Sequence, residues 1–373
     1  MIAPRLEINL NRIQHNARTL VQNLSQKGIA VTGVTKAFLG SSGIARAMIG
    51  AGIKSLGDSR IENIEALRRA RIAAELVLIR SPMLSQVDRI VAAADVSFNS
   101  ELDIIGVLSA AARRADRRHG IILMVELGDL REGIMPRDLE GSVAKVLRLP
   151  NIALKGIGTN LGCRSGVVPD ALKMAELSAL VDAIEAKFSL SLETVSGGNS
   201  SNLAWALNTE NVERVNDLRL GEAILLGNDP LNGEPIPGLY TDAIVLVAEV
   251  IEAKMKPSMP WGEIALSPFA NKPITINRGD ILQAILAVGH QDVDPAGLYS
   301  MSGIKIAAAS SDHLIADVGR AELSVGSEVA FNLDYSALLR AMTSPFVAKV
   351  IKSVGQQVLG HRGLRESEDL IAN

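Results

Sequence analysis

The sequence predicts an α/β protein, in which a (β/α)8 TIM-like barrel is followed by a β-rich C-terminal domain. Three observations favour this fold class. Short apolar runs alternate with helical stretches over roughly the first two hundred residues. A cluster of Gly, Pro and Asn follows at 227–239, and the apolar runs beyond it succeed one another without long helices. Aromatic residues make up only 3% of the chain, so the core must be aliphatic, as in parallel barrels.

The barrel is expected to follow an opening strand-like segment at 6–10 and a helix at 11–24, whose apolar residues repeat at helical spacing. Barrel strands are predicted at 31–35, 53–56, 76–79, 96–98, 121–127, 152–157, 192–195 and 215–218. Helices between them are predicted at 42–49, 61–70, 101–114 and 169–187. This many alternating units fit a closed barrel better than an open sheet.

A second domain is predicted after the Gly- and Pro-rich cluster. We expect the barrel domain at 1–228 and the β-rich domain at 229–373, with residues 1–10 able to pair with the second domain. Its strands are predicted at 243–253, 264–266, 274–276, 283–288, 304–308, 314–318 and 328–333. A helix at 335–341 precedes a polar tail.

The composition argues against several classes of protein. A net charge of -3 over 373 residues provides no basic field for nucleic acid. The longest apolar runs, such as 121–125 and 243–250, are too short to span a bilayer, and the first residues lack the apolar middle region of a signal peptide. Cys163 is the only cysteine, which excludes an internal disulfide and a cysteine metal cage. We therefore expect a cytoplasmic protein without a metal site.

One lysine stands out at the end of the first predicted barrel strand. Residues 30–34 form the pattern of a strand that is buried on both faces, and Lys36 follows it closely. A lysine is rarely buried unless its amine is paired or chemically used. Its stem could run past the strand end so that the amine reaches solvent. Alternatively, the amine forms a Schiff base with a carbonyl cofactor at the barrel rim.

The other residues at the rim decide between these two interpretations, because chemistry in such barrels takes place where the strands end. Polar or charged residues follow almost every predicted strand. They are Lys36, Asp58, Arg60, Arg80, Asn99, Ser100, Arg131, Asn160, 196–201 and 219–222. A barrel that is merely stable would need few of them, so the second interpretation is favoured.

Two of these rim loops are predicted to bind an anion. SGGNSS, at 196–201, places two glycines and then Asn199 and Ser200 at a helix start, where backbone N–H groups attract phosphate. RLGEA, at 219–223, follows the eighth strand in the same style. SGGNSS could also be only a tight turn with a helix N-cap. A lysine on the first strand and a phosphate site after the seventh and eighth together indicate pyridoxal 5'-phosphate as the cofactor.

The segments VTKAFLG, LGDSRIENI, MVELGDLREGI, GIGTNL, SGGNSS, LRLGEAILLG, SSDHL and DYSALLRAMTSP carry a resemblance. In combination they are similar to the alanine-racemase-like enzymes of pyridoxal phosphate fold type III, and most closely to the ornithine racemase group. The resemblance covers nearly the whole chain. It implies a homodimer in which the partner's β domain completes each active site.

The resemblance also implies roles for individual residues. Lys36 would hold the cofactor, and Arg219 would face the pyridine nitrogen, leaving it unprotonated because a guanidinium keeps its proton. Asn160 stands where relatives of the alanine type carry a histidine behind the cofactor ring. Positions that match the phosphate site are Asn199, Ser200, Gly221, Glu222 and Tyr335. Positions that match the surroundings of the cofactor ring and the substrate carboxylate are Arg131 and, from the neighbouring subunit, Ser311 and Asp312.

Two departures from the alanine racemase pattern concern catalysis and the substrate. Gly40 replaces a tyrosine four residues after the lysine, and Ser267 stands where the partner's catalytic tyrosine is expected. An unassisted serine is a poor proton shuttle, so His313, His290 or Asp312 could act as the second base. Histidine titrates nearest to neutral pH, which favours His313, although His313 beside Asp312 could equally be a structural histidine.

The predicted reaction is inversion at Cα of a free amino acid by two bases, with Lys36 on one face. Loss of two tyrosines would make room for a long side chain, so ornithine is the expected substrate. Acids available for its terminal ammonium are Asp292, Asp294 and Glu263. Lysine, arginine, serine and alanine stay open as substrates. Rival functions are a decarboxylase, an aldolase or dehydratase acting on D-amino acids, and a non-catalytic protein that binds pyridoxal phosphate.

Overall fold

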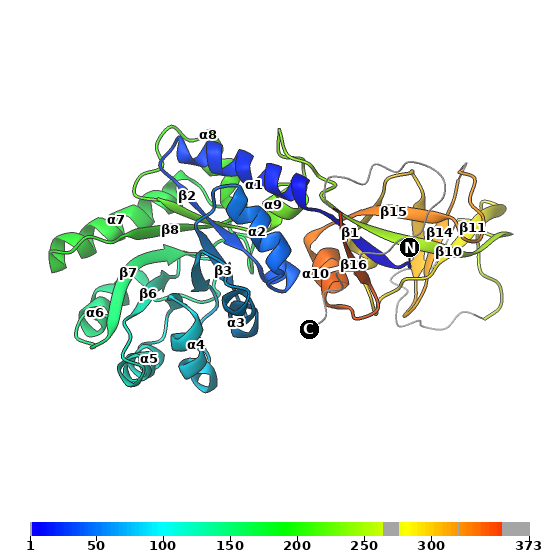
Figure 1. The fold of residues 1–373 in the computed structure, drawn as a ribbon. Coiled ribbons are helices and arrows are strands. Elements are labelled where there is room, and N and C mark those ends of the chain that lie inside the picture. Colours follow the sequence, from blue (N-terminus) through cyan, green and yellow to red (C-terminus); the bar gives the residue numbers. More distant parts are fainter. Residues whose placement is uncertain (1, 264–275, 320, 353–373) are drawn as a thin grey trace. The chain divides into compact units, whose positions relative to one another are not determined.

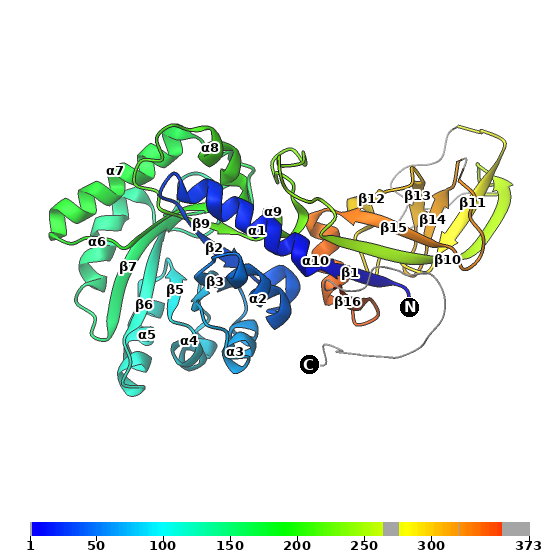
Figure 2. The ribbon, with the colours of Figure 1, turned by 45° about the horizontal axis from the view of Figure 1, so that its top comes forward.

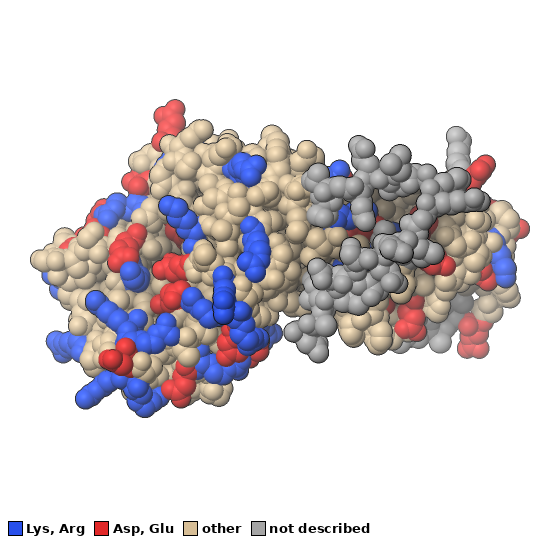
Figure 3. All heavy atoms as spheres, viewed as in Figure 1, with Lys and Arg blue, Asp and Glu red and all other residues tan. Residues whose placement is uncertain are grey.

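The structure, a computed structural model, describes residues 2–263, 276–319 and 321–352. Contacts divide the chain into two units, which are described separately (Figure 1). One unit is Ile13–Tyr240, and the other combines Met1–Arg12 with Thr241–Asn373. None of the described helices is long and apolar enough to cross a membrane. Positive and negative side chains are interspersed on the face of the barrel unit that Figure 3 draws.

The first unit is a closed barrel of parallel strands in chain order, which confirms the predicted fold class. Its strands are β2 (Ala30–Val34), β3 (Ser55–Asp58), β4 (Glu75–Leu78), β5 (Val96–Asn99), β6 (His119–Val125), β7 (Ile152–Thr159), β8 (Thr194–Asn199) and β9 (Asp217–Leu220). Each falls on or beside a predicted apolar run. The barrel closes by pairing β2 with β9, which sets Thr32 opposite Arg219.

Helices connect these strands and lie outside the barrel (Figure 2). They are α1 (Leu10–Ser25), α2 (Ser42–Gly50), α3 (Ile61–Arg69), α4 (Val87–Ala93), α5 (Leu102–Arg114), α6 (Pro136–Val146), α7 (Ala171–Phe188), α8 (Leu203–Asn208) and α9 (Glu222–Leu226). The sequence had not predicted α4, α6, α8 or α9. Three of these have only five to seven residues, too few to repeat an apolar stripe.

One part of the barrel interior is apolar. Val77, Val96, Phe98, Ile122 and Met124 form a buried cluster there. A close approach of strands also explains one glycine: a Cβ at Gly156 would lie 2.0 Å from the Thr194 carbonyl oxygen on the neighbouring strand. Only glycine lets β7 and β8 pair at this point.

The Gly- and Pro-rich segment belongs to the barrel unit. The Ile236 N–H donates to the Gly227 carbonyl, and the Asn16 side chain on α1 bonds both the N–H and the carbonyl of Tyr240. These bonds tie the segment back onto the barrel helices. The change of unit therefore comes between Tyr240 and Thr241, whereas the sequence predicted it after Asn228.

The second unit is built on a mainly antiparallel sheet with the order β12-β15-β10-β11-β14-β13. These strands are β10 (Ile244–Pro257), β11 (Asp280–Leu286), β12 (Leu298–Ser300), β13 (Lys305–Ala309), β14 (Leu314–Asp317) and β15 (Glu328–Leu333). The opening strand β1 (Arg5–Asn9) pairs antiparallel with β10 and parallel with β16 (Ala348–Lys352). Of the predicted strands, 264–266 and all of 274–276 except residue 276 lie outside the described residues.

The helix α10 (Tyr335–Thr343) follows β15, close to its predicted bounds. Asp334 caps it by accepting a hydrogen bond from the Ala337 N–H at 2.8 Å. The sequence had not predicted β12 or β16. Both are short, and neither shows strict alternation of buried and exposed residues.

Candidate active site

Lys36 lies just beyond the carboxyl end of β2, where the sequence placed it. It begins the short 3-10 helix η1 (Lys36–Phe38) and is half-buried. The residue before it is fixed from two sides, because the Thr35 N–H donates to the Gly57 carbonyl at 2.8 Å and its hydroxyl donates to Asp58 Oδ2 at 2.5 Å. The backbone that carries the lysine amine is therefore anchored to β3.

Asp58, at the end of β3, is the anchor for this part of the rim. Its buried carboxylate accepts from the Thr35 hydroxyl, from the Arg60 N–H at 2.8 Å and from the Asn63 amide. Burial raises the pKa of the Asp58 carboxyl, against these hydrogen bonds, which act to lower it. Asp58 thus serves to position the loop that carries Lys36.

Gly40 has a backbone reason for being glycine. Its φ is +67°, and an added Cβ would lie 3.0 Å from the Asn63 Cβ and 3.1 Å from the Asn63 carbonyl oxygen. A tyrosine could not occupy this position without strain. Glycine is required at this position because η1 turns back against α3 and leaves no space for a side chain.

Arg219 is buried on β9, the strand beside β2. Its Nη1 donates to the Ser196 hydroxyl at 2.6 Å, and its Nη2 donates to the Thr159 carbonyl at 2.8 Å and to Asn160 Oδ1 at 3.2 Å. The guanidinium carbon lies 5.0 Å from the centroid of the Phe98 ring. Burial lowers the pKa of Arg219 to about 10, with Asp217 opposing the shift and Arg131 adding to it. Arg219 is therefore still a cation at neutral pH.

Asn160 joins Arg219 to the loop after β8. Its Oδ1 also accepts from Asn199 Nδ2 at 3.1 Å, while its own Nδ2 is buried and has no hydrogen-bond partner in the described part of the chain. A buried donor without a partner usually indicates an absent acceptor.

The loops after β8 and β9 begin two short helices beside each other. Asn199 caps the 3-10 helix η3 (Ser200–Asn202) by accepting from the Ser201 N–H at 2.8 Å. The Ser200 hydroxyl accepts from the Ala223 N–H, in the first turn of α9, at 3.3 Å. Two helix N-termini with hydroxyl groups between them provide the donors that a phosphate requires.

Arg131 lies in the loop after β6 and is half-exposed, with its guanidinium paired to the neighbouring Glu132. Glu126 holds this loop by accepting three backbone N–H groups, including that of Arg131 at 3.0 Å. Arg131 and Arg219 are close enough for their charges to interact. Arg131 therefore belongs to the same region of the rim.

The remaining candidates lie in the second unit. Tyr335 begins α10, and Ser311, Asp312 and His313 form the turn between β13 and β14. Asp312 and His313 are exposed, and the Asp312 carboxylate accepts from Gln291 Nε2 at 2.8 Å. Ser267 lies outside the described residues.

Comparison with known proteins identifies the family. Residues 8–229 match the family model described as the N-terminal domain of alanine racemase. The chain belongs to the alanine racemase family.

Two curated relatives match almost the whole length of this alanine racemase family member. A lysine racemase from Thermotoga maritima is 40% identical over 94% of this chain and 99% of the relative. An ornithine racemase from Acetoanaerobium sticklandii is 38% identical over 93% of this chain and 99% of the relative. The chain is thus an amino-acid racemase, as the sequence predicted.

Solved structures share the fold. An alanine racemase from Bartonella henselae, solved with covalently bound pyridoxal phosphate, superposes with a TM-score of 0.72 at 17% identity. The match covers 94% of this chain and 100% of that one. Within the described residues, no group of three or more His, Cys, Asp or Glu side chains is arranged to hold a metal ion.

The rim of this alanine racemase family member fits pyridoxal phosphate. The Lys36 amine can react with the aldehyde, the paired helix starts can bind the phosphate, and Arg219 presents a buried cation. The Asn160 Nδ2, which has no partner among the described residues, is a further donor in the same region. Donors for the ring and the phosphate would therefore come from β7, β8, β9 and the loops that follow them.

Two buried residues beside Arg219 were missed from the sequence. Asp217 precedes Arg219 by two positions on β9, and Thr32 on β2 donates to its Oδ1 at 2.7 Å. A charged residue two positions before a rim arginine must face the same side of its strand, and this signal could have found Asp217. Thr32 gave no such signal, because a threonine is ordinary in a buried strand.

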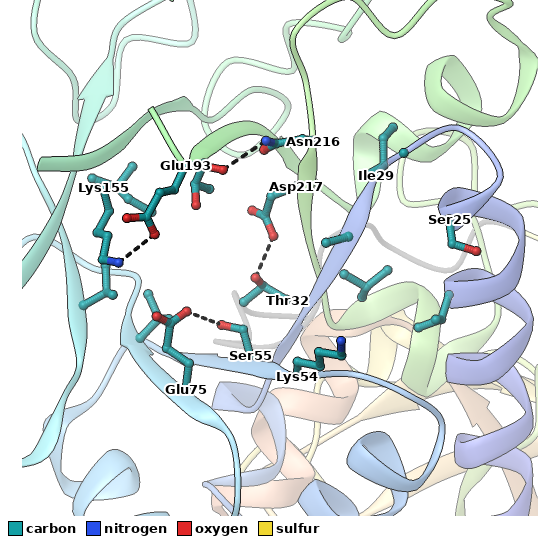
Figure 4. A pocket seen from close by; sticks show the side chains of 18 of the residues that line it. Ser25, Ile29, Thr32, Lys54, Ser55, Glu75, Lys155, Glu193, Asn216 and Asp217 are labelled. Atoms are coloured by element: carbon teal, nitrogen blue, oxygen red, sulfur yellow. Dashed lines mark hydrogen bonds and ion pairs between the residues drawn. The ribbon is translucent and has the colours of Figure 1, made fainter. Parts of the chain in front are cut away.

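A cavity of about 480 Å³ lies at the opposite, N-terminal mouth of the barrel (Figure 4). Glu75 and Ser55 at the starts of their strands line it, as do Lys155 and Glu193, which form an ion pair at 2.6 Å. Chemistry in this fold belongs to the other mouth. The cavity is therefore not the candidate active site, although Asp217 reaches its inner end.

Proposed function

We propose that this protein uses pyridoxal 5'-phosphate to invert the configuration at Cα of a free basic amino acid, either ornithine or lysine. The observation that carries the proposal is a half-buried lysine amine at the end of β2. It lies beside the strand that holds the buried Arg219 cation, in the same rim as the two helix starts. The relatives named for ornithine and lysine are nearly equally similar to this chain, and thus support both substrates.

Lys36 would hold the cofactor through its amine. When bound, pyridoxal phosphate withdraws electrons and makes the Cα proton of an attached amino acid acidic. Lys36, released by the substrate amine, would then remove or return the proton on its own face of the substrate. Its fixed backbone limits the positions that its amine can take, as proton transfer requires.

Arg219 would donate to the ring nitrogen of the cofactor. With a pKa of about 10 it stays protonated at neutral pH, so the nitrogen beside it would stay unprotonated. A neutral ring withdraws electrons less strongly, which suits a reaction that only moves a proton. Ser200, Asn199 and the backbone N–H groups of Gly221 and Glu222 would bind the phosphate. Tyr335 stays a phosphate residue that the family resemblance implies.

A second base must act on the opposite face of the substrate. We propose that the partner subunit of a homodimer supplies it from the turn at Ser311, Asp312 and His313. Asp312 and His313 are exposed in this chain and so available to a partner. The Asp312 carboxylate accepts from Gln291 Nε2 and from the Ser311 hydroxyl. His313 would then carry the proton.

Gly40 does not by itself support a long substrate, because an added Cβ there would lie 3.0 Å from the Asn63 Cβ. Two of the acids considered for the terminal ammonium have structural partners. Asp292 accepts from the Ser344 hydroxyl at 2.7 Å, and Asp294 accepts from the Ser336 hydroxyl at 2.7 Å. Both fasten α10 within the second unit, so the exposed Glu263 is the better candidate of the three.

Replacement of Lys36 by Ala tests the proposal. We expect K36A to lose the absorbance of covalently bound cofactor after desalting and to lose activity by roughly a thousandfold or more. Lys54→Ala, an exposed lysine at the other mouth of the barrel, is the matched control and should keep both. A K36A variant that racemises at the wild-type rate would refute the role of Lys36.

Chiral chromatography of ornithine, lysine, arginine, serine and alanine after incubation with the enzyme tests the substrate class. We expect ornithine or lysine to be inverted fastest. A clear preference for alanine would contradict the proposed long-substrate pocket.

A further inference from the structure

A chain of hydrogen bonds extends from Arg219 into the barrel. Arg219 Nη1 donates to the Ser196 hydroxyl at 2.6 Å, and that hydroxyl donates to Asp217 Oδ2. The Thr32 hydroxyl donates to the other carboxylate oxygen of Asp217 at 2.7 Å, and Figure 4 shows the two side chains pointing toward one another. All four side chains are buried. They come from β2, β8 and β9, so this series of hydrogen bonds crosses adjacent strands.

The direction of each bond follows from the number of available protons. A serine hydroxyl has one proton, and Ser196 uses it on Asp217. Its lone pairs are then the acceptors for Arg219, which can only donate. Burial raises the pKa of Asp217, while the Ser196 and Thr32 hydroxyls and the charge of Arg219 act to lower it. When Asp217 is ionised it fixes this arrangement, because a carboxylate accepts and does not donate. Replacing the carboxylate by an amide would bring a second donor group to Ser196 and remove the charge.

The same carboxylate is the main negative charge that favours the Arg219 cation. Arg219 is only 5% exposed, and burial alone disfavours its charged form. Its other partners, the Thr159 carbonyl and the Asn160 amide oxygen, are neutral. Asp217 has no direct ion pair with Arg219. Ser196 bonds both side chains, so the position and charge of Asp217 act on Arg219 through Ser196.

We propose that Asp217 is a positioning residue of the cofactor site, which acts through Ser196 to hold the charged Arg219 guanidinium in place for the pyridine ring. The inference rests on the proposed function, in which Arg219 faces that ring. Asp217 itself does not reach the rim. It lies behind Arg219, at the inner end of the N-terminal cavity.

The test is a double-mutant cycle on the full-length protein, with pyridoxal phosphate as the probe. Asp217→Asn and Ser196→Ala should each weaken cofactor binding by roughly tenfold to a hundredfold, as expected for loss of a hydrogen bond to a charged group. Each should also shift the absorbance maximum of the bound cofactor. Both changes break the same link between Asp217 and Arg219. The double variant should therefore bind pyridoxal phosphate about as tightly as whichever single variant has the lower affinity.

Thr32→Val is the matched control, since it removes a hydrogen bond to Asp217 but keeps the carboxylate and the link through Ser196. We expect its cofactor absorbance maximum to match that of the wild type. A purely structural role for Asp217 would lower thermal stability without moving that maximum.

The outcomes separate this inference from the proposed function. A wild-type protein that stays colourless with pyridoxal phosphate would overturn both. A coloured wild type with a D217N variant of unchanged affinity and absorbance would overturn the role of Asp217 alone. Should D217N fail to fold, an S196A variant with wild-type absorbance and affinity would overturn it in the same way.

Discussion

His119 makes the stability of the barrel depend on pH in a way that can be calculated. It begins β6, is 1% exposed, and its Nε2 lies 2.8 Å from the Ser97 hydroxyl oxygen. Burial lowers the pKa of His119 to about 4, with the positive charge of Arg117 acting in the same direction. The folded barrel therefore excludes a proton that the unfolded chain accepts at its ordinary pKa of 6.5.

The sign and size of the effect follow from proton linkage. Above pH 6.5 both states carry a neutral imidazole, so the full stability is present. As the pH falls toward 4, only the unfolded state gains a proton, and the free energy of unfolding decreases. Between pH 7 and pH 5 the loss is about 2 kcal/mol, out of about 3 kcal/mol for the whole shift. For a unit of this size, 2 kcal/mol corresponds to roughly 4 to 8 °C in Tm.

The assay compares the wild type with His119→Gln, whose amide can still bond Ser97 but does not titrate. Urea unfolding at pH 7 and pH 5 gives two free energies for each protein. All other titrating groups are the same in the two proteins. The free energy of unfolding of the wild type should therefore fall by about 2 kcal/mol more than that of H119Q over this interval. Equal losses in the two proteins, or an NMR titration of folded His119 near pH 6.5, would refute the reasoning.

Two further predictions concern the phosphate loop and the shared active site. Gly198→Ala would bring a Cβ to 2.0 Å from Asn202 Oδ1, so we expect about 1–3 kcal/mol lower stability in urea unfolding and weaker cofactor binding. Gly106→Ala, in α5 with open space around it, should instead leave cofactor binding unchanged and gain up to about 1 kcal/mol. Mixing the inactive K36A variant with His313→Ala should restore racemase activity, because one site of each mixed dimer would keep both groups. No recovery in dimers shown to have exchanged subunits would contradict the shared site.

The order of residues along the chain was enough to predict the two-part architecture and to place several polar residues at one mouth of the barrel. Alternation of apolar runs and helical stretches is a property of consecutive residues, so it predicted every barrel strand. The end of each strand then placed Lys36, Asn160, Asn199 and Arg219 at one mouth, because parallel strands in a barrel all point the same way. Short elements such as α9 and β12 were not predicted, since they contain too few residues for a repeating pattern of apolar positions.

Which side chains meet depends on how strands distant in the sequence pair with one another. Thr32, Ser196 and Asp217 are far apart in the chain, and pairing of β2 and β8 with β9 brings them behind Arg219. The bonds of Asn16 to Tyr240 likewise assign the Gly- and Pro-rich segment to the barrel, although its composition is that of a linker. The periodicity of apolar residues predicts which face of a helix or strand is buried. It does not predict which neighbouring element lies against that face. That neighbour is set by strand register and barrel closure, which join residues across the whole chain.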